Sequence, residues 1–356
     1  MNSGRFDAKR RERSRAKVAG RDGAALGSAD RRRWHLLCVS ALGLLVGRPA
    51  SAQTRKWRIA LFSGAQSSPS FMRNVADPFR DGLREAGYVE GQNVELHFRW
   101  ADGQPERLPR LAAELLQLTP DVLVAIGPGP AQAAKAATTQ VPVVALAVDD
   151  PVETGLIADF ARPGGNLTGI SSFGGELVAK RLQLIKELVP AMRRVAVLMN
   201  PATAKRPDLE PAVARFGRPL GLQTQVVEAA TPEQFDAAFD DMVRQRAEGV
   251  LVLGDATFFT HRARLHELVA KHRLPSVWGG RDYLPPNGLA SYQSDFPAIF
   301  KRGAAMVDRI LKGAKPAVTP FEQATKLELV INLKAAQAMG LAVPQSLLLA
   351  ADEVIR

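Results

Sequence analysis

Short apolar runs alternate with amphipathic segments along most of this chain, and this alternation predicts a parallel β-sheet covered by helices. Ten runs have the length of strands and contain few polar residues: 57–63, 94–100, 122–126, 141–148 and 167–171, then 195–200, 223–228, 249–253, 276–278 and 289–292. Continuous apolar runs are typical of strands that are buried on both faces. The sequence therefore predicts the α/β class, built from successive βα units.

Apolar residues at three- and four-residue steps predict helices between these strands. The clearest stripes lie within 72–86, 108–116, 235–243 and 299–311. Gly87 is expected to end the first helix, and Thr231 is expected to cap the third. Beyond residue 319 the pattern is less regular and predicts an extended piece at 327–331, followed by two short helices.

The two series of strands predict two doubly wound lobes, because a core of this size divides at about 250–300 residues. A turn cluster, Arg162 to Asn166, lies near the end of the first series. We expect lobe 1 to comprise residues 53–171 plus about 294–318. Lobe 2 is expected to comprise residues 172–293 plus about 319–356.

The first 52 residues predict export. Three arginines at 31–33 precede an apolar run, 34–47, and Ala50 to Ala52 supply the small residues that a signal peptidase reads. The run is shorter than the ~20 residues that a membrane-spanning helix needs. We expect cleavage after Ala52 and a periplasmic protein, with residues before Arg31 as an N-terminal extension.

Removing this leader changes the charge of the chain. The whole sequence holds 47 Lys+Arg and 36 Asp+Glu, a net charge of +11. Residues 1–52 hold 12 and 4 of these, which leaves 35 and 32 interspersed charges, so we expect no nucleic-acid partner. Cys38, the only cysteine, also lies in the leader, which excludes a disulfide in the mature chain. Lipidation of Cys38 is the alternative to simple cleavage, although Leu37 stands where a small residue normally precedes a lipidated cysteine.

Motifs of common enzyme classes are absent from the sequence. G-x-S-x-G, the Walker A loop, G-x-G-x-x-G and H-E-x-x-H do not occur. The four histidines after the leader, His97, His261, His266 and His272, show no paired spacing for zinc. We therefore expect a non-catalytic protein without metal or cofactor. A small-molecule enzyme with a nonsequential triad is the alternative.

Polar and glycine-rich residues follow several strands, where ligands bind in open α/β sheets. Ser63 and Ser67 follow the first strand. Gly127 and Pro128 open a helix whose N-terminus favours an anion, and a tight turn is the equal alternative.

Acidic and aromatic residues also end strands. Asp150 and Asp255 are suited to a ligand ammonium group, or alternatively to helix capping. Phe173, Trp278 and Tyr292, with Phe258, Phe259 and Tyr283, are candidates for an aromatic cleft lining, with plain core packing as the alternative for each. Together these features favour a zwitterion with a hydrophobic part, such as an aromatic or branched amino acid.

Several blocks of sequence resemble one family. They are Phe79 to Asn93 (FRDGLREAGYVEGQN), Phe98 to Ala101 (FRWA), Asp150 to Val152 (DPV), Arg162 to Gly169 (RPGGNLTG), Lys326 to Asn332 (KLELVIN) and Leu341 to Leu348 (LAVPQSLL). The chain resembles the substrate-binding proteins of ABC transporters in the tryptophan/tyrosine-type group. The resemblance implies a type I periplasmic binding protein: two lobes joined by a multi-strand hinge, closing on a small molecule.

The same resemblance implies a role and a site. The protein is expected to be a monomer that delivers its ligand to an ABC permease, and a module of the same fold feeding a membrane sensor is the alternative. Ser63, Gly127, Asp150, Asn200 and Asp255 are expected to line the cleft. Many family members have Gly-Thr-Pro or Gly-Gly-Thr where this chain has Gly127-Pro128-Gly129.

Overall fold

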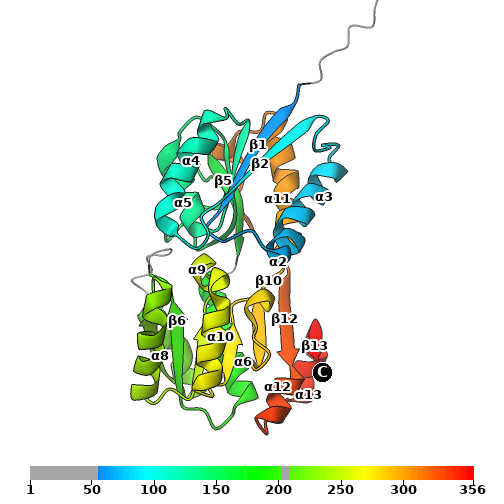
Figure 1. Ribbon diagram of the computed structural model, residues 1–356. Coiled ribbons are helices and arrows are strands. Elements are labelled where there is room, and N and C mark those ends of the chain that lie inside the picture. Colours follow the sequence, from blue (N-terminus) through cyan, green and yellow to red (C-terminus); the bar gives the residue numbers. More distant parts are fainter. Residues whose placement is uncertain (1–54, 173, 202–208) are drawn as a thin grey trace, which may run out of the picture. The chain divides into compact units, whose positions relative to one another are not determined.

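Two β-sheets organise the chain in the computed structural model, which describes residues 55–172, 174–201 and 209–356 (Figure 1). The first sheet has the strand order β11-β5-β4-β3-β1-β2, and all its pairings are parallel. Its strands are β1 (Trp57–Ser63), β2 (Val94–Trp100), β3 (Val122–Ile126), β4 (Val143–Asp149), β5 (Leu167–Ser172) and β11 (Glu322–Gln323).

Helices cover both faces of this first sheet. Helices α4 (Leu108–Gln117) and α5 (Pro128–Ala137) pack on the face that carries Ala60 and Phe62. Helices α3 (Asp77–Glu85) and α11 (Phe296–Leu311) pack on the other face with Ile59 and Leu61. The alternation of neighbouring strand residues between two apolar clusters explains why the runs contain few polar positions. We call this sheet and its helices lobe 1.

The second sheet has the order β13-β12-β10-β9-β8-β6-β7. Its strands are β6 (Arg194–Met199), β7 (Gln223–Glu228), β8 (Gly249–Val252), β9 (Ser276–Trp278), β10 (Ala290–Ser294), β12 (Leu327–Asn332) and β13 (Glu353–Ile355). All pairs are parallel except β10 with β12, which is antiparallel.

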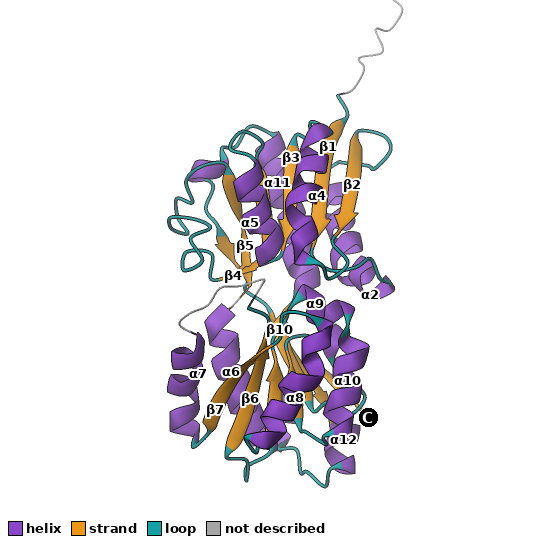
Figure 2. Cartoon of the chain, turned by 60° about the vertical axis from the view of Figure 1, so that its left-hand side comes forward, coloured by secondary structure: helices purple, strands orange, loops and turns teal. Residues whose placement is uncertain are grey.

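Helices also cover the two faces of the second sheet, as Figure 2 shows for α8 and α6. One face holds α6 (Gly174–Leu188), α7 (Leu209–Gly217), α12 (Leu333–Ala338) and α13 (Gln345–Ala350), and the other holds α8 (Phe235–Arg244) and α10 (Arg262–Lys271). The short helix α9 (Ala256–Thr260) follows β8. We call this sheet and its helices lobe 2.

The chain passes from one sheet to the other three times. The crossings run from β5 to α6, from β10 to α11, and from β11 to β12. Residues Arg55–Arg356 form one compact unit. The predicted fold class, two doubly wound α/β lobes joined by a multi-strand hinge, is confirmed.

The segment that returns to lobe 1 runs further than the expected limit near residue 318. Strand β11 pairs with β5, with Glu322 opposite Ile170, and Phe321 is buried in the lobe 1 core. The hydroxyl of Thr168 donates to the carbonyl of Thr319 at 2.9 Å. A strand of two residues is too short to produce a pattern in the sequence, so the prediction assigned it to lobe 2.

The predicted helix at 72–86 is divided in two. Residues Met72–Ala76 form a π-helical turn before α3, and the N–H of Asp77 donates to the carbonyl of Met72. Pro78 has no N–H with which to continue regular α-helical spacing. At the other end, Gly87 has φ +91 and follows the helix, as predicted.

No helix within the described ranges is long and apolar enough to cross a membrane. The predicted leader, with its cleavage site at Ala52, lies outside the described residues.

Candidate functional site

A cavity of about 310 Å³ lies where the carboxyl ends of strands from both sheets meet. Lobe 1 contributes the ends of β1, β3, β4 and β5, and lobe 2 contributes the ends of β6, β8 and β10. Ligands of open α/β sheets bind at this end of the strands. The volume is at the lower limit of the ~300–1,000 Å³ found for small-molecule sites, so the cavity suits a small ligand.

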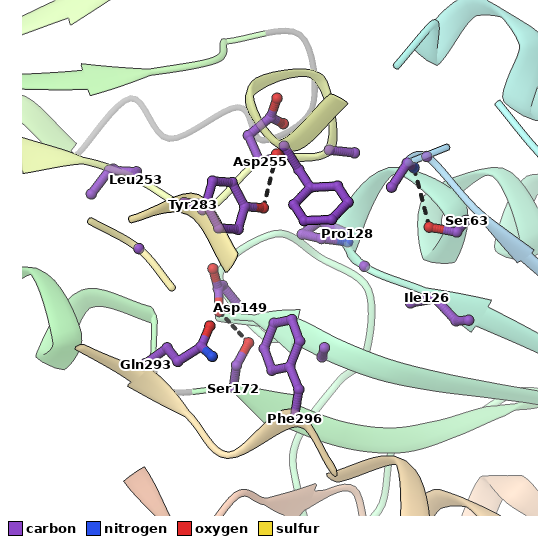
Figure 3. A pocket seen from close by; sticks show the side chains of 18 of the residues that line it. Ser63, Ile126, Pro128, Asp149, Ser172, Leu253, Asp255, Tyr283, Gln293 and Phe296 are labelled. Carbon is purple, nitrogen blue, oxygen red and sulfur yellow. Dashed lines mark hydrogen bonds between the residues drawn. The ribbon is translucent and has the colours of Figure 1, made fainter. Parts of the chain in front are cut away.

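The predicted residues Ser63, Gly127 and Pro128 all line the cavity, and Figure 3 labels Ser63 and Pro128. Ser63 ends β1 and is buried, and its hydroxyl accepts the N–H of Ala65 at 3.1 Å. This bond forms a local turn, which orients the serine at the cavity wall.

The start of α5 offers few donors for an anion. Gly127 caps the helix with φ +94, and its own N–H donates to the carbonyl of Leu146 at 2.9 Å. Pro128 and Pro130 have no N–H, and the N–H of Ala131 donates to the carbonyl of Gly127 at 3.1 Å. Gly129 therefore holds the one N–H of this first turn that the helix itself does not require. The turn alternative describes this segment better than the anion site does.

Asn200 and Asp255 line the cavity from lobe 2. The Asp255 carboxylate accepts the N–H groups of Thr257 at 2.8 Å and Phe258 at 3.2 Å, which makes it the N-cap of α9. The side-chain amide of Asn200 donates to the same carboxylate at 3.0 Å. The capping alternative for Asp255 is therefore what the structure shows.

The acid of lobe 1 that lines the cavity is Asp149, the last residue of β4, whereas Asp150 is not among the described residues that line it. Asp150 has φ +44, and its carbonyl accepts the N–H of Thr154 at 3.0 Å. It thus begins the turn that comes after the strand. The carboxylate of Asp149 instead accepts the hydroxyl of Ser172, at the end of β5.

An arginine that the sequence analysis did not select also lines the cavity. Arg181 of α6 is only 5% exposed. Its Nε donates to the carbonyl of Tyr292 at 2.8 Å, and its Nη2 lies 3.4 Å from the carbonyl of Gly279. Burial lowers the pKa of Arg181 to about 10, and the negative charge of Asp149 opposes this shift. The sequence did contain a signal for this arginine. It is a charged residue within the apolar stripe formed by Val178, Leu182 and Ile185.

Aromatic rings form the apolar part of the lining. Phe71, Phe259, Tyr283 and Phe296 contribute to it. Phe259 and Tyr283 meet edge to face with their ring centroids 5.3 Å apart, and the Tyr283 hydroxyl donates to the carbonyl of Asp255 at 3.0 Å. The rings that line the cavity thus come from both lobes, whereas the sequence predicted an aromatic lining from the second half alone.

Five other predicted site residues lie elsewhere or cannot be placed. Phe258 is fully buried in the lobe 2 core and does not belong to the described cavity lining. Trp278 is fully buried in the lobe 2 core, and its indole N–H donates to Ser276 at 2.8 Å. Tyr292 packs against the other core cluster of lobe 2. Ser67 is exposed beyond β1, and neither it nor these two rings belongs to the described cavity lining. Phe173 lies outside the described residues.

The lobes touch beside the cavity. The hydroxyl of Thr257 in lobe 2 donates to the carbonyl of Gly103 in lobe 1 at 3.2 Å. The amide of Asn74 in the π-helical turn donates to the carboxylate of Asp282. A Cβ atom on Gly64 would lie 3.0 Å from the Cβ of Ala256, so this glycine permits a close approach of the lobes.

No group of three or more His, Cys, Asp or Glu side chains that could hold a metal ion is found among the described residues.

Sequence comparison matches residues 66–355 to the family described as ABC transporter substrate binding protein. A tyrosine-binding protein from Clostridioides difficile is 22% identical over 263 residues, which cover 74% of this chain and 75% of that protein.

Solved structures show the same architecture. An ABC domain in complex with L-Trp from Streptococcus pneumonia is 26% identical with a TM-score of 0.78, covering 84% of this chain and 100% of that one. A leucine binding protein from Thermotoga maritima has a TM-score of 0.54 at 12% identity, covering 72% of this chain and 83% of that one, and shares the fold.

Proposed function

We propose that this chain, which belongs to the family of ABC transporter substrate-binding proteins, captures an amino acid with an apolar side chain and delivers it to an ABC permease. The observation that carries the proposal is the cavity of about 310 Å³, which has charged groups and aromatic rings in one lining. An α-amino acid presents the same two kinds of surface. The tyrosine and L-Trp named for two of its relatives support this ligand class.

Aromatic or branched side chains fit the apolar part of the lining better than polar ones. Phe71 and Phe296 come from lobe 1, and Phe259 and Tyr283 come from lobe 2. A ring placed among them buries apolar surface, at roughly 25 cal/mol per Å² removed from water.

Binding is proposed to close the two lobes about the hinge. Three chain crossings join the lobes and residues of both lobes line one cavity, so a ligand in it bridges them. A ligand that contacts both lobes binds the closed arrangement more tightly than the open one, and it shifts the population accordingly. The closed state is the form expected to dock on the permease as a monomer.

The protein is proposed to act in the periplasm and to leave its ligand chemically unchanged. The signal pattern ending at Ala52 supports export, and lipidation at Cys38, which would anchor the chain to a membrane, is the alternative. Membership of a family of binding proteins supports the absence of turnover. Intact-mass analysis of a periplasmic extract should show a chain that begins at Gln53, and a lipid-bearing chain that begins at Cys38 would replace that expectation.

A thermal-shift screen of purified residues 53–356 against the twenty amino acids, simple sugars and small carboxylates tests the ligand class. An aromatic or branched amino acid at 100 times its Kd should add about 2.7 kcal/mol to the free energy of unfolding. Phe296→Ala should weaken the confirmed ligand about tenfold by removing part of the apolar lining. Gln337→Ala, an exposed change on α12, is the matched control and should bind like the parent.

Stabilisation by sugars or simple carboxylates, with none by any amino acid, would overturn the ligand class. Conversion of the bound molecule, detected by mass spectrometry after prolonged incubation, would show that the protein is an enzyme.

A further inference from the structure

The end of β4 departs from a regular strand immediately before the cavity. Pairing with β5 is one to one as far as Leu146 opposite Ile170, and it resumes with Val148 opposite Ser171. Ala147 is left over as a bulge, with φ +56. This left-handed conformation is unfavourable for any residue with a Cβ atom, and such strain is concentrated at functional sites.

The bulge decides which aspartate reaches the cavity. Before it, Val143 and Ala145 face one core cluster of lobe 1, while Val144 and Leu146 face the other. In a regular strand, residues 148 and 150 would lie on the same face as Leu146. The bulge shifts the count by one, so Val148 joins the cluster of Val143, and Asp149 lies on the cavity.

Asp149 then lies in the field of a buried cation from the other lobe. The carboxylate accepts the hydroxyl of Ser172, and its charge acts favourably on the guanidinium of Arg181. Two of the five N–H groups of Arg181 are directed at the backbone carbonyls of Tyr292 and Gly279. These contacts fix the direction of the guanidinium plane, and the side chain still forms part of the cavity lining.

We propose that Asp149 and Arg181 together hold the charged head group of the ligand, with the ammonium at Asp149 and the carboxylate at Arg181. The inference rests on the proposed function, because it assigns the polar half of an amino acid to residues of the same cavity. A zwitterion placed there meets a carboxylate from lobe 1 and a guanidinium from lobe 2. Its two charges would therefore connect the lobes.

Other polar groups of the cavity are less suited to this role. Asp255 is committed to the N-cap of α9 and to Asn200. The start of α5 provides one N–H, that of Gly129, beyond what the helix uses. An arginine offers a fork of donors that matches a carboxylate in two places.

Three probes separate the two charges: L-tryptophan, its amide, which lacks the carboxylate, and 3-indolepropionate, which lacks the amine. Asp149→Asn should weaken L-tryptophan and the amide about 10- to 100-fold and change 3-indolepropionate less than about threefold. Arg181→Lys should weaken L-tryptophan and 3-indolepropionate and leave the amide nearly unchanged. Asp150→Asn is the matched control and should match the parent for all three probes. Calorimetric titration provides the affinities, and circular dichroism checks that each variant is folded.

The outcomes distinguish the two proposals. If the parent binds none of the twenty amino acids, the proposed function fails. If the parent binds L-tryptophan, but Asp149→Asn binds all three probes as the parent does, the head-group assignment alone is overturned. The same holds if Asp150→Asn produces the loss instead. Should another amino acid bind best, its own amide and deaminated acid replace the tryptophan pair. Should Arg181→Lys not fold, the contrast between the Asp149 and Asp150 variants decides the question.

Discussion

Each lobe ends a central strand with an aspartate beside the cavity, and the two aspartates are used differently. In lobe 2, α9 begins directly after Asp255, and the carboxylate is bonded to the first N–H groups of that helix. In lobe 1, residues 150–166 form turns and loop between β4 and β5, so no helix begins directly after Asp149. Its carboxylate interacts instead with Ser172 and with the charge of Arg181. The two aspartates therefore differ because of the chain that follows each of them. Asp255 caps a helix, whereas Asp149 is proposed to bind the ligand.

The largest effect is expected from removing the cation that faces Asp149. Arg181→Gln should lower the free energy of unfolding by about 2–4 kcal/mol, because it leaves two backbone carbonyls without their donor and the partly buried carboxylate of Asp149 without the nearby cation. Urea denaturation measures this loss. Lys180→Gln, an exposed change on the same helix, should shift the free energy by less than about 0.5 kcal/mol. A loss below about 1 kcal/mol in Arg181→Gln would mean that water compensates for the missing guanidinium. The surroundings of Asp149 and Asp255 would then differ less than described above.

The next largest effect is expected at Asp255, where a substitution should lower stability and leave affinity nearly unchanged. Asp255→Ala should cost about 1–2 kcal/mol of unfolding free energy, because α9 loses its cap, and should change ligand affinity less than about threefold. Asp255→Asn should restore most of the stability, since asparagine also caps helices. Denaturation and calorimetry on the same samples provide both numbers. A large affinity loss in Asp255→Asn would return the ammonium site to lobe 2.

A smaller effect, of opposite sign, is expected at the bulge. Ala147→Gly should raise the free energy of unfolding by about 0.5–1 kcal/mol, because glycine adopts a φ near +56 without steric cost. Ala145→Gly, two residues earlier in the regular part of β4, should instead lower it by at least about 0.5 kcal/mol. Thermal unfolding of the pair measures both. Equal losses in the two variants would show that Ala147 is not strained.

The smallest effect is a pH dependence confined to lobe 2. Burial lowers the pKa of His266, and the positive charge of Arg262 acts in the same direction, against the bond to the carbonyl of Tyr283. The folded state therefore takes up a proton at lower pH than the unfolded state does. Stability should fall as the pH drops below about 6.5, through the folded pKa.

His266→Gln should reduce this fall, while behaving like the parent at pH 7.5. Unfolding at pH 7.5, 6.0 and 5.0 provides the comparison. An unchanged slope in the variant would assign the acid sensitivity to other groups.

The strands were predictable because their signal is local. The run at 122–126 became β3 with the predicted bounds, and its residues are all buried. Thr231 also caps as predicted, through a capping box with Gln234. These features depend on residues within a few positions of one another, which a sequence displays directly.

Ser63, Asn200 and Asp255 were predicted and line the cavity, but the pair Asp149 and Arg181 was not predictable in the same way. The choice of Asp149 over Asp150 depends on one unpaired residue, Ala147, and alanine gives no sign that it will adopt a left-handed conformation. Arg181 and Asp149 come from different lobes and line one cavity only in the folded structure. The burial of Trp278 likewise depends on α8 and α10, which cover this side chain only in the folded lobe. Such features result from register and long-range packing, which periodicity does not encode.

Helix α11 has a consequence for how the chain acquires its structure during synthesis. It supplies Ile299, Phe300, Met306 and Val307 to the cluster that covers one face of the first sheet, and Figure 1 shows it in orange against blue and cyan elements. A nascent chain that has emerged only as far as β10 would expose that apolar face, with α3 as its main cover. Lobe 1 therefore cannot complete its core until nearly the whole polypeptide has left the ribosome. Fragments cut at the end of the first strand series would lack a helix that this lobe needs to fold.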